Sequence, residues 1–264
     1  MAGLDTESVL TLLQEVAARL ITPRFRALAG DEVMEKNPGD LVTIADREAE
    51  VEITARLLAA YPDAVVLGEE AHSEDPTLME RFRAAEHAFT VDPVDGTKNF
   101  VHGSPDHAVM VAEIRDGQTV RSWIWQPEYG VGWVAERGAG VWRNGVRVER
   151  QPAGGDPQGA TSIWRLRGQA LPGLSTMRLS WVCCGIDYPR LMEGACDYIV
   201  YGGMNPWDHA PGTLMVAEAG GRCGHPDGTP YGPRSTQRGL IVAADPRTYA
   251  AVLDRAQDAF SPAG

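Results

Sequence analysis

Two aspartates stand three residues apart at the end of an apolar segment, in the run Val91-Asp92-Pro93-Val94-Asp95-Gly96-Thr97. Two carboxylates held this close repel each other and raise a pKa unless a cation lies between them. Carboxylate oxygens suit Mg²⁺, which also keeps positions for water and for substrate phosphate oxygens. Gly96 and Thr97 follow at an expected helix start, where backbone N–H groups bind anions. The segment therefore predicts a metal site beside a phosphate site, although a tight Asp-Gly turn explains it equally well when taken alone.

Three further acidic positions could complete such a site. Glu69 and Glu70 follow the apolar run 64–67, and this strand end lies near Asp92 if the two strands are neighbours. Asp46 and Asp208 each stand at an expected helix start. Each of these positions also has a plain structural explanation, as a solvated loop residue or as an N-cap.

Charge and cysteine content limit the classes of function. The formal charge of −12 disfavours binding to nucleic acids and anionic membranes, and a phosphorylated small molecule would need a local cation. The four cysteines form no C-x-x-C pair, so we expect buried, reduced thiols rather than a disulfide scaffold. No segment reads as a signal peptide or a spanning helix, which predicts a cytoplasmic protein without a membrane contact.

The elements that position these residues follow from periodicity and turn chemistry. Apolar residues at helical spacing, caps and stops predict helices over 6–28, 46–61, 208–219 and 246–260. Short apolar or alternating runs predict strands over 64–67, 88–91, 107–114, 119–125, 131–135, 198–201 and 240–244. Asn144-Gly145 predicts a hairpin, and Lys36-Asn37-Pro38-Gly39 predicts that 35–40 is a loop.

This order of elements predicts layered α and β structure, of the α+β or α/β class. A stretch rich in Gly, Pro and Gln over 151–160 reads as a connector between two halves. We therefore expect an N-terminal α+β half over 1–150 that carries most metal ligands. A C-terminal α/β half over 151–264 would contribute Asp208 and the substrate pocket.

The acidic segments together resemble the inositol monophosphatase family, within the lithium-sensitive, magnesium-dependent sugar and nucleotide phosphatases. Four segments carry the resemblance in family order across nearly the whole chain: Asp40-Leu41-Val42-Thr43-Ile44-Ala45-Asp46, Gly68-Glu69-Glu70, Asp92 to Phe100, and Trp207-Asp208. The resemblance implies a layered α-β-α-β-α sandwich of the sugar-phosphatase type and a homodimer.

The resemblance also implies roles for single residues. Glu69 and Asp92, with the carbonyl of Val94, would hold one Mg²⁺. Asp92, Asp95 and Asp208 would hold a second, and a third, weaker ion would lie near Glu69. Asp46 and the Thr97 hydroxyl would orient the attacking water, with Glu69 as a further catalytic group. The backbone at Gly96 and Thr97, together with Asp95 and Lys36, would bind the phosphate and substrate.

Two positions depart from the family pattern. Cys183, in Val182-Cys183-Cys184-Gly185, stands where many members have Gly-Ser/Thr-Ala-Ala. Tyr201 replaces an acidic residue that reads substrate hydroxyls seven positions before the last aspartate. Both are expected to line the substrate pocket. These departures leave the catalytic half intact and weaken the expectation of inositol itself.

The resulting expectation is a Mg²⁺-dependent phosphomonoesterase that hydrolyses inositol monophosphate or a related small polyol or sugar phosphate through a metal-activated water. Within the superfamily, the alternatives are fructose-1,6-bisphosphatase, histidinol-phosphatase or 3'(2'),5'-bisphosphate nucleotidase activity, and Lys98 is compatible with a second phosphate. The alternative outside enzymology is an inactive, metal-binding regulatory protein.

Overall fold

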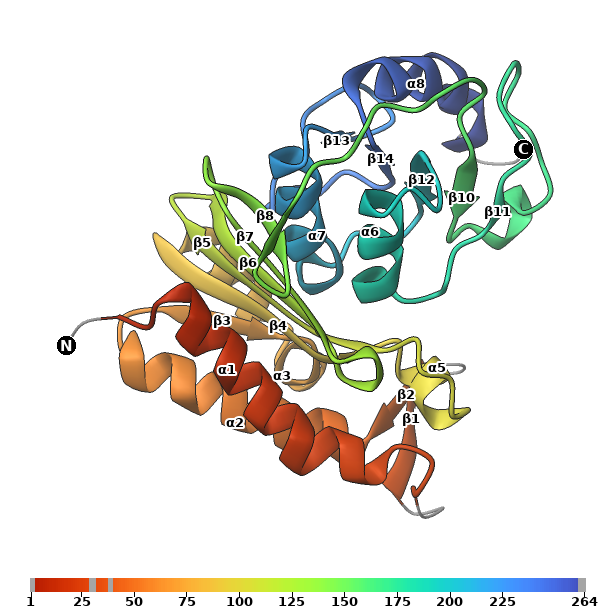
Figure 1. Cartoon of the computed structure of the whole chain (residues 1–264). Coiled ribbons are helices and arrows are strands. Elements are labelled where there is room, and N and C mark those ends of the chain that lie inside the picture. The colour runs from red at the N-terminus through yellow and green to blue at the C-terminus, as the bar shows by residue number, and fades with distance from the viewer. Residues whose placement is uncertain (1–2, 29–31, 38–39, 261–264) are drawn as a thin grey trace.

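The computed structural model describes residues 3–28, 32–37 and 40–260, with the backbone alone for 36, 37, 40 and 256–260. It has five layers (Figure 1). Helices α1 (Thr6–Val16) and α2 (Ile44–Ala60) cover one face of a seven-stranded sheet. Helices α6 (Cys184–Met192) and α7 (Pro206–Glu218) lie between that sheet and a five-stranded sheet, and α8 (Pro246–Phe260) covers the outer face. This arrangement is the expected α-β-α-β-α sandwich.

The larger sheet has the order β3-β4-β5-β6-β7-β8-β9. Its strands are β3 (Val65–Gly68), β4 (His87–Asp95), β5 (Ala108–Arg115), β6 (Gln118–Gln126), β7 (Val131–Glu136), β8 (Gly140–Arg143) and β9 (Val146–Val148). Only β3 and β4 run parallel; the other neighbours are antiparallel. Every predicted strand of this region is present, and positive φ angles at Asn144 and Gly145 confirm the predicted hairpin turn.

The smaller sheet has the order β11-β10-β12-β14-β13. Its strands are β10 (Gly159–Thr161), β11 (Arg178–Leu179), β12 (Tyr198–Tyr201), β13 (Arg222–Gly224) and β14 (Leu240–Ala243). The larger sheet ends at Val148 and the smaller sheet begins at Gly159, so the last two residues of the predicted connector over 151–160 lie in β10. The division of the chain into two halves, 1–150 and 151–264, remains a prediction.

Both faces of the larger sheet are buried, which explains its apolar strands. Along β5, Val109 and Val111 face the core under α1 and α2, whereas Met110 faces the core under α6 and α7. The same alternation on β4 directs Val91 toward α1 and α2. The next residue, Asp92, therefore faces the opposite side of the sheet, where α7 begins.

The expectation of a loop over 35–40 is wrong. Strand β1 (Val33–Asn37) pairs antiparallel with β2 (Asp40–Thr43), and residues 38 and 39 lie outside the described residues. Lys36 and Asn37 are part of a strand, although their residue types favour a turn. Pairing between the two strands forms regular structure here, which a composition-based reading does not capture.

Three short helices had no sequence signal. They are α3 (Glu69–Glu74), α4 (Leu78–Ala84) and α6, each of fewer than ten residues, which is too short for a clear 3.6-residue period. A fourth short helix, α5 (Thr97–Val101), begins as expected after Gly96. The first predicted helix ends early, because α1 passes into a π turn (Ala17–Ile21) and a 3₁₀ turn (Thr22–Arg24). Two further 3₁₀ turns cover Pro127–Tyr129 and Trp164–Leu166.

No helix in the described part of the chain is both long enough and apolar enough to cross a bilayer.

A buried carboxylate on β5 gives a prediction about stability. The side chain of Glu113 is 3% exposed and accepts hydrogen bonds from His87, Arg121 and Arg115. Burial alone would raise its pKa, but these partners lower the pKa to about 2. Relative to an ordinary value near 4.5, the difference corresponds to about 3 kcal/mol of stability. Because the folded-state pKa is the lower one, this stability is present above pH 4.5 and is lost as the pH falls toward 2.

We therefore expect Glu113→Gln to lower the free energy of unfolding by about 3 kcal/mol at pH 7, measured by urea denaturation. The deficit should shrink as the pH falls from about 4.5 toward 2, where the wild type loses the same stabilisation. Glu149→Gln, at an exposed glutamate, is the control and should change little at any pH. A deficit independent of pH would contradict the assignment.

Candidate active site

The ends of two parallel strands bring the first acidic residues together. Strands β3 and β4 pair in register, with Gly68 opposite Val91. Glu69 follows β3 as the first residue of α3, and Asp92 is the next residue on β4. The condition for Glu69 to lie near Asp92, that these two strands are neighbours, is therefore met.

A bulge in β4 places the two aspartates on the same side of the strand. Asp92 lies opposite Met110 and Asp95 opposite Ala108, so three steps on β4 match two steps on β5. In a regular strand, residues three apart point to opposite faces. The extra residue changes that alternation, as bulges do.

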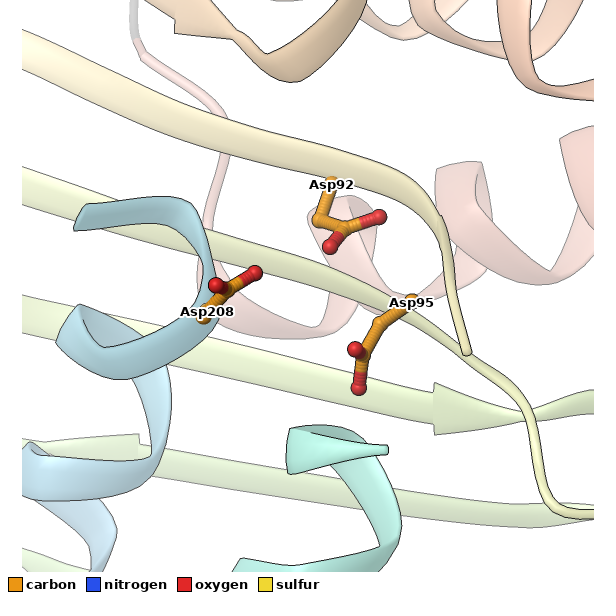
Figure 2. Close-up of side chains that lie close together, drawn as sticks. All are labelled: Asp92, Asp95 and Asp208. Carbon is orange, nitrogen blue, oxygen red and sulfur yellow. The ribbon is translucent and has the colours of Figure 1, made fainter. Parts of the chain in front are cut away.

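Asp208, in the first turn of α7, completes the cluster. Ligand oxygens of Asp92, Asp95 and Asp208 all lie within 4.8 Å of one another. Figure 2 shows the three carboxyl groups turned toward a common space, two from β4 and one from α7. Asp92 and Asp95 are buried and Asp208 is half-buried. These are three of the four predicted carboxylate metal ligands.

The electrostatics of the cluster favour a bound cation. Burial, followed by the charges of Glu69, Asp95 and Asp208, raises the pKa of Asp92 well above its usual value. Burial likewise raises the pKa of Asp95 to about 6 and that of Asp208 well above the ordinary range. Buried acids without a positive partner repel one another, and a divalent cation among their oxygens would remove that penalty. An all-oxygen donor set suits a hard ion such as Mg²⁺.

Asp46 reaches this site from α2. Thr43 is the N-cap of α2 and forms a capping box with Asp46, whose Oδ2 accepts the Thr43 N–H at 3.0 Å. The other oxygen, Oδ1, lies 3.1 Å from the Thr97 hydroxyl, which also lies 3.0 Å from the Val94 carbonyl. Burial raises the pKa of Asp46 to about 7. Asp46 is thus both part of the helix-capping box and a contact of Thr97, and its role toward the attacking water remains a prediction.

Gly96 makes the turn from β4 into α5. It is the N-cap of α5 with a φ of 82°, in the left-handed region that glycine adopts without strain. A Cβ at this position would lie 2.9 Å from the carbonyl oxygen of Asp106. The glycine therefore allows Thr97 to begin its helix within reach of Asp46.

Cys183 contacts the acidic cluster directly. Its thiol donates to Asp95 Oδ2 at 3.0 Å, and the Gly185 N–H donates to the same oxygen. Burial, together with the charge of Asp95, raises the pKa of Cys183 well above its usual value, so the thiol stays protonated and can donate. The residue was expected in the substrate pocket; the structure places it on a predicted metal ligand, and its contact with substrate remains a prediction.

Tyr201 and Lys36 are placed differently from the other predicted residues. Tyr201 ends β12 with 2% exposure, and its hydroxyl donates to Asp187 Oδ2 at 3.3 Å. Its predicted contact with substrate is untested. Lys36 lies in β1, but its side chain is outside the described part of the structure. Its predicted role therefore also remains untested.

Two buried acids support the site and were missed by sequence reasoning. Glu50 accepts the N–H groups of Glu70 and Ala71, both at 2.8 Å, and so fixes the start of α3 where Glu69 stands. Its position four residues after Asp46, on the buried face of the same helix, was a usable signal. Asp187 accepts the Trp181 N–H at 2.7 Å and holds the loop before Cys183. An acid between two apolar residues of α6 was its only sequence signal.

Comparison with known proteins agrees with this geometry. The model of the inositol monophosphatase family matches residues 5–259. The chain is 31% identical to an inositol-1-monophosphatase of Mesorhizobium japonicum over 254 residues, covering 90% of each. It is also 31% identical to the Nus factor SuhB of Vibrio cholerae over 242 residues, covering 86% of each. The solved structure of an IMPase of Thermotoga maritima has the same fold, with a TM-score of 0.78 and 24% identity over 95% of this chain and 96% of that one.

The matched region includes both sheets and every acidic residue of the cluster. Members of this family are metal-dependent phosphatases, in keeping with the acidic cluster. The chain belongs to the inositol monophosphatase family and is a phosphatase.

Proposed function

We propose that the protein is a Mg²⁺-dependent phosphomonoesterase that hydrolyses inositol monophosphate or a related small polyol or sugar phosphate. The observation that carries the proposal is the cluster of Asp92, Asp95 and Asp208 beside the Asp46–Thr97 pair. The cluster supplies cation ligands, and the pair supplies groups that can hold a water molecule. Phosphate monoesters hydrolyse extremely slowly unaided, so both parts are needed.

The donor set fits the expected metal. Glu69, Asp92, Asp95 and Asp208, with the carbonyl of Val94, would hold two Mg²⁺ ions, and a third would bind near Glu69. When bound, such ions lower the pKa of a coordinated water and neutralise charge on the phosphoryl and leaving oxygens.

The chain's own residues would orient the nucleophile. The Thr97 hydroxyl has one hydrogen, which it can donate to Asp46 Oδ1, and its oxygen is then free to accept a hydrogen bond from water. Asp46 is itself fixed by Thr43, so the water would be held without movement of α2. Backbone N–H groups at Gly96 and Thr97 would hold the phosphate. No covalent phosphoenzyme is required.

The proposed range of substrates is narrower than the family assignment, which shows a phosphatase without naming its substrate. Cys183 and Tyr201 stand where substrate hydroxyls are expected to be read. Asp187 links the two positions, because it accepts hydrogen bonds from the Trp181 N–H, just before Cys183, and from the Tyr201 hydroxyl. Fructose 1,6-bisphosphate, histidinol phosphate and an adenosine bisphosphate remain alternative substrates. Nus factor SuhB is the name of related proteins and is not assigned to this chain. A homodimer and a cytoplasmic location remain predictions.

The test is phosphate release from a panel of phosphorylated metabolites by the purified protein. We expect release in Mg²⁺, loss of release in EDTA, recovery on adding Mg²⁺ back, and inhibition by Li⁺. If calorimetry detects Mg²⁺ binding but no ester is hydrolysed, the protein is instead a metal-binding regulatory member. Turnover that persists fully in EDTA would contradict the metal-dependent mechanism.

A further inference from the structure

A cavity of about 420 Å³ lies beside the acidic cluster, and we call it the arginine cavity. It is formed by α4, by the segment 202–206 and by the segment 235–238. Asn205 lines it, and the Asn205 amide donates to Asp208 Oδ2 at 3.2 Å. The same segment begins directly after Tyr201. The cavity therefore adjoins the acidic cluster through Asn205.

The charge of the arginine cavity is opposite to that of the chain. The whole chain has 36 acidic and 24 basic residues, yet the described lining has two arginines, Arg83 and Arg238, and no acid. Neither guanidinium has a hydrogen-bond or ion-pair partner within the described residues. Nearby arginines do have partners: Arg81 pairs with Asp75, and Arg234 donates to the carbonyl of Ala85. The two lining guanidinium groups are thus available to a ligand.

The remaining polar lining can also donate. Ser235, Thr236, Gln237 and Asn205 add hydroxyl and amide groups. Leu78 and Phe82 lie in one core cluster with Trp207, and this packing holds the helix backbone from which the exposed Arg83 side chain extends. A site of guanidinium, hydroxyl and amide donors without carboxylates matches a phosphate or a carboxylate group.

Resting on the proposed function, we propose that the arginine cavity binds a second anionic group of the substrate. The substrate is then a phosphomonoester that also carries a phosphate or a carboxylate. The reacting phosphate is held at the acidic cluster, and the second group is held by Arg83 and Arg238. Inositol monophosphate, which has no second anionic group, is not the preferred substrate under this inference.

Two other cavities fit this role less well. One, of about 340 Å³, is also lined by two arginines, but Arg137 donates to the carbonyl of Thr119 and Arg222 stacks on Tyr249. The other is lined by Lys98 with the exposed side chains of Trp164 and Val182, so it offers one cation beside apolar groups. Lys98 therefore provides the competing location for a second anionic group.

The experiment compares matched substrates that differ in the second group. Fructose 1,6-bisphosphate is compared with fructose 1-phosphate, and 3-phosphoglycerate with glycerol 3-phosphate, which separates a phosphate from a carboxylate. In at least one of these pairs, we expect kcat/KM to be at least about tenfold higher for the member that carries the second anionic group. Arg83→Ala and Arg238→Ala should each lower that value by about tenfold and leave the matched partner unchanged. A double variant with Arg83→Lys and Arg238→Lys keeps both positive charges and should retain part of the preference that the alanine variants lose.

Arg147→Ala is the control, since Arg147 is an exposed arginine outside the cavity and should have no effect. Equilibrium titration of the same compounds into Asp46→Asn protein, in which turnover is strongly slowed, gives a binding readout, and the preference should appear there as a difference in Kd. Equal kcat/KM within both pairs, unaffected by the arginine variants, would overturn the inference and leave the phosphatase proposal standing. Loss of the preference in Lys98→Ala alone would place the second group elsewhere and also overturn it. If no ester is hydrolysed, the phosphatase proposal fails, and the titration alone decides whether the cavity binds anions.

Discussion

Asp92→Asn is expected to lower kcat/KM for phosphate release by at least about 10³-fold while making the metal-free protein more stable. Asp92 lies at the centre of the cluster, with oxygens near those of both Asp95 and Asp208. An amide offers one neutral oxygen in place of a charged carboxylate, so cation binding and transition-state stabilisation are both lost. In the metal-free protein, the same change removes one charge from a set of buried, mutually repelling acids.

The measurement pairs steady-state kinetics in saturating Mg²⁺ with thermal unfolding in EDTA. In EDTA, we expect the melting temperature of Asp92→Asn to exceed that of the wild type by about 2 °C or more. In Mg²⁺, we expect the wild type to have the higher melting temperature, because the bound cation stabilises it. Asp116→Asn, at an exposed turn on β5–β6, should change neither quantity. Near-normal turnover by Asp92→Asn would disprove the assignment of the site.

Asp46→Asn should lower kcat by about 10²- to 10³-fold with a much smaller effect on KM. The carboxylate accepts from the Thr97 hydroxyl at 3.1 Å, and that contact leaves the hydroxyl oxygen free for water. An asparagine can present its NH₂ group to Thr97 and reverse the hydrogen bond, so the water would no longer be oriented. Thr97→Val removes the hydroxyl itself and should reproduce the loss.

Asp46 also caps α2, so a structural effect must be separated from a catalytic one. Thr43→Val removes the N-cap hydroxyl of α2 and should cost about 1 kcal/mol of stability while changing kcat much less than Asp46→Asn. Urea denaturation and kinetics on the three variants give both quantities. If Thr43→Val lowers kcat as much as Asp46→Asn, Asp46 acts only through the helix cap, and its role toward water is refuted.

Much of the fold was readable from local pattern. The strands on either side of Asn144-Gly145 follow from alternation and from the turn chemistry of that dipeptide. Strand β4 was recognised over 88–91 from its apolar run, which is typical of a strand buried on both faces, and the structure extends it to Asp95. The short helices were not recognised: α4 depends on Leu78 and Phe82 packing against Trp207, more than a hundred residues away in the sequence. The pairing of β1 with β2 was missed for a related reason, because it depends on contacts between two segments rather than on a pattern within either one.

The sequence singled out Glu69, Asp92 and Asp95 after apolar segments and Asp208 at an expected helix start, and the family resemblance joined these four residues into one predicted site. Their residue types also predicted oxygen coordination of a hard cation. Whether they meet was decided only by the tertiary structure. Parallel pairing sets Glu69 beside Asp92, a bulge turns Asp95 to the same side, and the packing of α7 on the sheet delivers Asp208.

The arginine cavity was not visible in the sequence for the same reason. Arg83, Asn205 and Arg238 come from three segments that have no shared local pattern. Sequence spacing determines which face of a helix or strand a residue occupies, because that depends on the backbone period of one element. The distance between residues on different elements depends on how those elements pack. The sequence therefore lists the charged residues, and only the tertiary structure decides which of them meet in a site.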